Sequence, residues 1–122
     1  WIHVDDHNDA VWAILDRGAI GATYLIGADG ERANIDVVGD LLEVFGRGRD
    51  EFVHVTDRPG HDRRYAIDPS SMEGLGWEPA YRDFHAGLAA TVDWYRANPG
   101  WWAAAYDAAE AGYARVEKPI AP

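Results

Sequence analysis

A short stretch at residues 57–65, with the sequence DRPGHDRRY, gathers the side chains best suited to bind an anion. The chain carries 21 Asp and Glu against 11 Lys and Arg, yet three of those basic residues fall within this stretch, beside a histidine. Pro59-Gly60 predicts a turn, and arginine offers planar, forked donors that match phosphate and carboxylate oxygens. Two interpretations follow from the residues alone: a site for a small anion, or a salt-bridged surface hairpin in which Asp57 and Asp62 neutralise two of the arginines.

Asn34 and Tyr113 are further candidates for ligand contact. Asn34 follows the glycine-containing turn at 27–30, a position where loop-borne binding groups tend to lie. Its alternative role is to cap the helix that begins there. Tyr113 belongs to an aromatic set near the C-terminus whose helical spacing is typical of packing residues, with base stacking or phosphate contact as the alternative.

The first residues also carry groups that could bind a metal, namely His3, Asp5, Asp6 and His7. Helix capping by Asp5 or Asp6 is the simpler interpretation. The sequence contains no Gly-x-Gly-x-x-Gly, no P-loop, no Tyr-x-x-x-Lys pair, no Gly-x-Ser-x-Gly and no cysteine. These residues therefore hold no recognisable redox or nucleophilic centre.

Composition narrows the class of protein. With 122 residues the chain is one domain or part of one. A net charge of −10 argues against binding nucleic acid, and no run is as long and apolar as a membrane span. The absence of cysteines is compatible with a cytoplasmic location. Because the sequence starts on an apolar run at Trp1 without an initiator methionine, we expect further residues upstream.

The pattern of apolar residues predicts the elements that would position these groups. Runs of sheet-favouring residues predict strands at 1–4, 23–26, 52–55 and 65–67. Apolar residues at helical spacing predict helices from Asp5 or Asp6 to Gly18, then at 34–45, 84–98 and 101–116, with another helix start at 69–71. The apolar face of the first helix is expected to comprise Ala10, Val11, Ile14 and Leu15. Short strands mixed with helices predict an α/β or α+β fold.

Taken in order, several segments resemble the dTDP-glucose 4,6-dehydratases, a family of the extended short-chain dehydrogenase/reductase superfamily. The segments are WIHVDDH at 1–7, TYLIG at 23–27, NIDVV at 34–38, DRPGHDRRYAID at 57–68, LGWEP at 75–79 and TVDWY at 91–95. The opening segment and LGWEP are shared across the superfamily, whereas the run at 57–68 is more specific to the dehydratases. Two departures are His3, where an aromatic residue such as Tyr is common, and the 27–30 turn, which lacks the usual double glycine.

The resemblance implies that residues 1–122 form the C-terminal, substrate-binding lobe of a longer α/β enzyme, with the NAD-binding Rossmann part largely absent from this chain. It implies conversion of dTDP-glucose to dTDP-4-keto-6-deoxyglucose, a step of deoxysugar (for example rhamnose) biosynthesis, with NAD and the catalytic residues held upstream. It also implies that the intact enzyme is a cytoplasmic homodimer. The net charge and the lack of a long apolar run predict no nucleic-acid or membrane partner. The implied substrate-binding residues are Asn34, Asp57, Arg58, Pro59, Gly60, His61 and Tyr113, with Arg58 on the diphosphate. The alternatives are another NAD-dependent sugar-nucleotide epimerase or dehydratase, and a non-catalytic nucleotide-sugar binding module.

Overall fold

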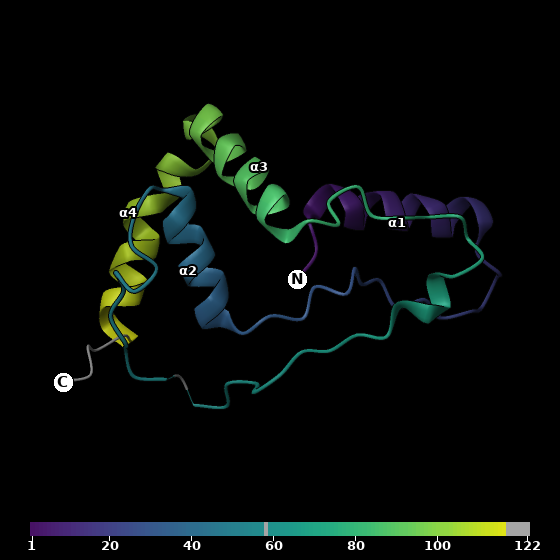
Figure 1. The fold of residues 1–122 in the computed structure, drawn as a ribbon, viewed down its shortest axis with the longest axis horizontal. Coiled ribbons are helices and arrows are strands. Elements are labelled where there is room, and N and C mark those ends of the chain that lie inside the picture. Colours follow the sequence, from purple (N-terminus) through teal and green to yellow (C-terminus); the bar gives the residue numbers. More distant parts are fainter. Residues whose placement is uncertain (58, 117–122) are drawn as a thin grey trace.

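The computed structural model describes residues 1–57 and 59–116, and its regular structure is helical (Figure 1). In chain order the elements are α1 (Val4–Arg17), α2 (Asn34–Val44), the 3₁₀ helix η1 (Pro69–Met72), α3 (Phe84–Ala97) and α4 (Pro99–Val116). The helices at 34–45, 84–98 and 101–116 and the helix start at 69–71 are thus confirmed to within a few residues. Within the described residues, no helix is long and apolar enough to cross a membrane.

The start of α1 differs from expectation in its cap. His3 is the N-cap residue, and its Nδ1 accepts a hydrogen bond from the backbone N–H of Asp5 at 3.2 Å. Val4 already belongs to the helix, so the strand predicted at 1–4 is wrong, as is the cap predicted at Asp5 or Asp6. The His3 ring packs on Tyr81 with 4.0 Å between ring centroids, which fixes the imidazole where it can cap the helix.

The side chain of Asp6 is buried and faces the segment that leads into α3. It is 2% exposed. One carboxylate oxygen accepts from the N–H of Ala80 at 2.7 Å, and the other accepts from the N–H of Tyr81 at 3.0 Å. The two charge-assisted bonds join residues more than 70 positions apart in the chain.

The hydrophobic core lies between α1 and η1. Ala10, Met72 and Leu75 are buried at its centre, and the partly buried side chains around them are Ile14, Tyr24, Ile26 and Trp77. Small side chains at Ala10 and Ala13 let neighbouring segments pack closely against α1. The predicted apolar face was correct for Ala10 and Ile14 but wrong for Val11 and Leu15, which are 37% and 70% exposed.

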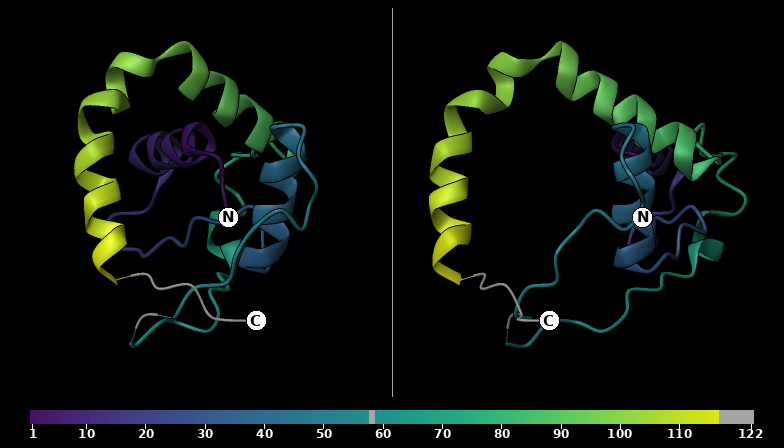
Figure 2. Two further views of the ribbon diagram at one scale, coloured as in Figure 1. Left: turned by 90° about the vertical axis from the view of Figure 1, so that its left-hand side faces the viewer. Right: turned by 60° about the vertical axis from the view of Figure 1, so that its left-hand side comes forward.

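The other helices pack through aromatic and cationic side chains. α2 lies against α3, where the guanidinium of Arg96 stacks 4.9 Å from the ring centroid of Phe45. α3 meets α4 through edge contacts of Trp101 with Trp94 and Tyr95. The chain turns at Asn98, and α3 and α4 together form an arc (Figure 2).

The described residues contain no β-strand, only an isolated β-bridge residue at Val55, so the mixed α/β fold is not confirmed and the predicted strands are not formed as strands. Two of them nevertheless lie in antiparallel segments that run side by side (Figure 1). The N–H of Leu25 donates to Ser71 Oγ at 2.7 Å, a Cβ added at Gly27 would lie 3.5 Å from Ile67, and Glu31 pairs with Arg64. Side-chain contacts replace a hydrogen-bonded ladder, since a two-stranded ribbon without further strands is marginal in water.

Replacing Asp6 by alanine should destabilise the protein by about 3 kcal/mol, because two buried N–H groups lose a charged acceptor. Urea denaturation followed by circular dichroism measures the change. Asp9→Ala, at an exposed position of the same helix, is the matched control and should shift the midpoint little. Equal midpoints for the two variants would contradict the role assigned to Asp6.

Candidate functional site

The turn predicted to bind an anion is held by local side-chain contacts. Gly60 adopts a positive φ of 74°, a backbone conformation that glycine reaches without strain. Nδ1 of His61 lies 2.6 Å from a carboxylate oxygen of Asp57, and Asp62 accepts a hydrogen bond from the hydroxyl of Tyr65. Arg58, the residue expected on the diphosphate, lies outside the described residues.

Arg64 reaches out of the turn to a distant carboxylate. Its Nε and Nη2 donate to the two oxygens of Glu31 at 2.5 and 2.9 Å, the parallel geometry in which guanidinium and carboxylate match. The hydrogen bond from Arg64 lowers the pKa of Glu31, and the same bond raises the pKa of Arg64. This pair was not predicted from the sequence: Asp57 and Asp62 were the expected partners of the arginines, whereas Arg64 pairs with a residue 33 positions earlier.

Asn34 is the first residue of α2, and its side chain is exposed. The N-cap position belongs to Ala33, which provides no side-chain hydrogen bond. The capping interpretation of Asn34 is therefore wrong. Its amide is left on the surface at the end of the segment that carries Glu31.

The Glu31–Arg64 contact brings the two predicted binding segments toward each other. Asn34 lies three residues after Glu31, and His61 lies three residues before Arg64. Three residues span at most about 10 Å, so both predicted contact residues stay close to the ion pair. The ion pair thus links the segments that carry Asn34 and the 57–61 turn, although no direct contact of Asn34 with the turn is seen among the described residues.

Tyr113 lies in the last turns of α4 and is 57% exposed. In Figures 1 and 2 the C-terminal end of α4 points toward the same edge of the molecule as the 57–61 turn. No contact between Tyr113 and the other predicted site residues is seen in the described part of the chain. Its role stays a prediction.

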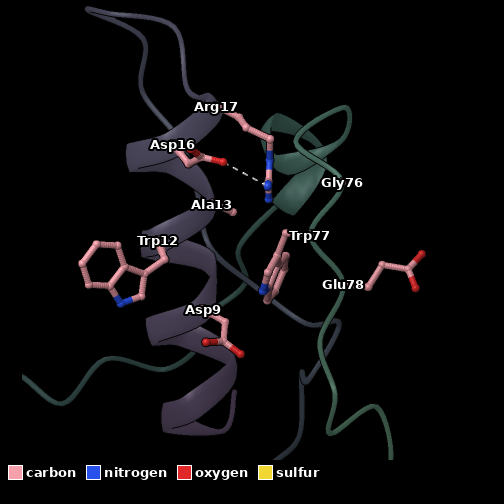
Figure 3. Close-up of a pocket in the computed structure, with 8 residues that line it drawn as sticks. All are labelled: Asp9, Trp12, Ala13, Asp16, Arg17, Gly76, Trp77 and Glu78. Carbon is pink, nitrogen blue, oxygen red and sulfur yellow. Dashed lines mark hydrogen bonds and ion pairs between the residues drawn. The ribbon is translucent and has the colours of Figure 1, made fainter.

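The surface pockets lie elsewhere. One, of about 530 Å³, lies between α1 and the segment 76–78, and Figure 3 shows Trp77 at its wall. Its charged lining residues are Asp9, Asp16, Arg17 and Glu78. Another, of about 540 Å³, includes Asp29, Glu73, Glu78 and Arg82. Carboxylates outnumber arginines in both, and neither includes a predicted site residue, so neither pocket suits a diphosphate.

Within residues 1–57 and 59–116, no group of three or more His, Asp or Glu side chains is arranged to hold a metal ion. His3 and Asp6 are instead used as a cap and as a buried acceptor. His7 is an exposed residue of α1. The metal-binding alternative for the first residues therefore has no support in the fold.

The carboxyl of Glu31 should titrate below its usual range, and Arg64→Gln should raise its pKa toward 4.3, the value of an unperturbed glutamate. Because the folded-state pKa is the lower one, the stabilisation is present above about pH 4.3 and is lost as the pH falls through the folded-state value. Carbon-13 NMR of the carboxyl measures the shift. Glu51 is the control: its pKa is lowered by the N–H of Gly48 and by Arg47, so it should not respond. An unchanged Glu31 pKa in Arg64→Gln would contradict the pairing.

The chain is similar in sequence to known proteins. No family model matches the chain. It is 60% identical over 114 residues to the dTDP-glucose 4,6-dehydratase of Mycolicibacterium smegmatis, a match that covers 93% of the chain and 34% of that protein. The protein of the same name from Escherichia coli is 40% identical over 109 residues, covering 83% of the chain and 30% of the relative.

A solved structure matches as well. The crystal structure of dTDP-glucose 4,6-dehydratase from Bacillus anthracis in complex with NAD superposes with a TM-score of 0.75 at 42% identity. The match covers 84% of this chain and 32% of that one. The chain thus spans about a third of the length of the relatives it matches. It is a homologue of the C-terminal part of the dTDP-glucose 4,6-dehydratases.

Proposed function

We propose that residues 1–122 are the nucleotide-sugar-binding portion of an NAD-dependent dTDP-glucose 4,6-dehydratase, a carbon–oxygen lyase that converts dTDP-glucose to dTDP-4-keto-6-deoxyglucose. The observation that carries the proposal is the 60% identity over 114 residues to a protein of that name. The crystal structure in complex with NAD supports the choice of cofactor for the complete enzyme. In this proposal the chain contributes substrate-binding residues, and the residues that perform the chemistry lie outside it.

In this proposal the turn at 57–61 meets the diphosphate-sugar, with Arg58 as the charged donor to the diphosphate. The contact between His61 and Asp57 supports a separate role for each ring nitrogen. Because an ionised carboxylate only accepts, Nδ1 carries the proton toward Asp57, and Nε2 is left to meet the ligand. Asn34 contributes an amide from the opposite segment, and Tyr113 closes the site from α4.

The described residues do not fit NAD. The chain lacks a glycine-rich dinucleotide loop, and the pocket beside α1 contributes more carboxylates than arginines, which would repel a pyrophosphate. The proposal therefore assigns NAD binding and the acid–base residues to parts of the enzyme outside these 122 residues. It also includes a cytoplasmic homodimer, and an α/β fold in which the segments at 23–26 and 65–67 complete a sheet supplied by the remaining chain.

The proposal is tested with the product of the complete gene. Incubation with dTDP-glucose should yield a 4-keto-6-deoxy sugar, measured by its absorbance in alkali. An epimerised hexose would favour a sugar-nucleotide epimerase instead. Binding of dTDP without conversion would favour a non-catalytic binding module.

Single substitutions at the turn should weaken dTDP binding in that protein. Arg58→Ala should raise Kd for dTDP about 10- to 100-fold, because it removes a charge-assisted hydrogen bond. Asn34→Ala should raise it up to about 10-fold, as expected for a neutral hydrogen bond. Isothermal titration calorimetry measures both. Arg47→Ala, which removes an arginine paired with Glu51 outside the predicted site, is the control, and an effect of Arg58→Ala no larger than that of the control would remove Arg58 from the site.

A further inference from the structure

The contact between Glu31 and Arg64 has a geometry that its stabilising effect does not explain. Both side chains are largely exposed, 52% and 69%, and ion pairs at such positions contribute little to stability. Yet both carboxylate oxygens are engaged by one guanidinium in parallel. Bidentate pairing of this kind fixes the relative orientation of two chain segments.

The residues on either side of Glu31 also contact Trp1, which precedes α1. The Trp1 indole donates to the carbonyl of Arg32 at 3.3 Å. A Cβ at position 30 would lie 2.0 Å from the carbonyl oxygen of Trp1, so only glycine allows this approach. The residues on either side of Glu31 are therefore anchored to the start of α1.

The ion pair is also the last contact between the two antiparallel segments before each reaches its predicted binding residues. Along the antiparallel segments, contacts run from Leu25–Ser71 through Gly27–Ile67 to Glu31–Arg64. Beyond that last contact the two segments diverge into α2, which begins with Asn34, and into the turn that ends at His61. The separation of the two groups depends on how Glu31 holds Arg64.

We propose that Glu31 and Arg64 are positioning residues that set the distance between Asn34 and the 57–61 turn, so that both reach one nucleotide-sugar. This inference rests on the proposed function and deepens it. The proposal also gives two arginines of the turn different roles. One edge of the Arg64 guanidinium is taken by Glu31, and the proposal gives Arg64 the role of holding the turn in position, while Arg58 contacts the diphosphate.

Kinetics of the complete gene product test the proposal. Glu31→Gln and Arg64→Gln should each raise KM for dTDP-glucose and Kd for dTDP about 5- to 10-fold, with kcat within about 2-fold, since binding is lost without loss of chemistry. The double variant should be no worse than either single variant, because one interaction is removed in all three. Arg64→Lys should fail to restore binding, since lysine keeps the charge but lacks the fork.

The sign of the Glu31→Gln effect separates positioning from simple electrostatics. Removing a negative charge near an anion would tighten its binding if charge alone mattered; positioning predicts that binding weakens. Glu51→Gln, which breaks a comparably exposed Arg47–Glu51 pair, is the control and should change KM less than 2-fold.

Three results would overturn the inference while leaving the proposed function intact. One is an active wild-type enzyme whose KM is unchanged or lowered by Glu31→Gln. Another is a loss of binding in Arg64→Gln but not in Glu31→Gln, which would make Arg64 a direct ligand contact. The third is a failure of the variants to fold, since an exposed pair that only positions ligand groups is not needed for folding. A wild-type gene product that neither binds dTDP nor converts dTDP-glucose would instead overturn the proposed function itself.

Discussion

The buried carboxylate of Asp6 is the interaction on which the arrangement of the helices depends. It fixes the backbone of Ala80 and Tyr81 against α1. Two residues later Asp83 caps α3, accepting from the N–H groups of His85 and Ala86. The direction in which α3 leaves is therefore set by a segment that α1 holds. Because α2 packs on α3, the position of Asn34 depends indirectly on the same carboxylate.

The helices could be predicted from the sequence because their signals are local. Helical spacing of apolar residues, the Pro-Gly break at 99–100 and Gly46, with φ of 71° after α2, all act within a few residues. The strands could not, because a strand exists only with a hydrogen-bonded partner, and pairing is not encoded in the run itself. The residues at 23–26 and 65–67 illustrate this: they lie in neighbouring segments, as strands would, but no ladder joins them.

The candidate site was predictable in its residue types and not in its pairings. The basic turn stood out because its arginines are rare in an acidic chain. The partner of Arg64 did not, because Glu31 is 33 positions away and resembles any other surface glutamate. Asn34 shows the converse: local reasoning favoured a cap, whereas the helix begins one residue earlier than a cap at Asn34 would require. Local chemistry left open whether the basic turn is an anion site or a salt-bridged hairpin, and the expectation of a substrate-binding turn came from the family resemblance.

The distribution of ion pairs bears on the anion site proposed for a chain with a net charge of −10. Its carboxylates neutralise most arginines locally, as in Arg17–Asp16, Arg49–Asp40 and Arg82–Glu78. Among the arginines whose side chains the structure describes, Arg63 alone has no carboxylate within ion-pair distance. It lies in the basic turn, where Asp57 meets His61 and Asp62 meets Tyr65. Arg63 is therefore the least directly compensated of these arginines, although the carboxylates of Asp57 and Asp62 keep their charge in the same turn.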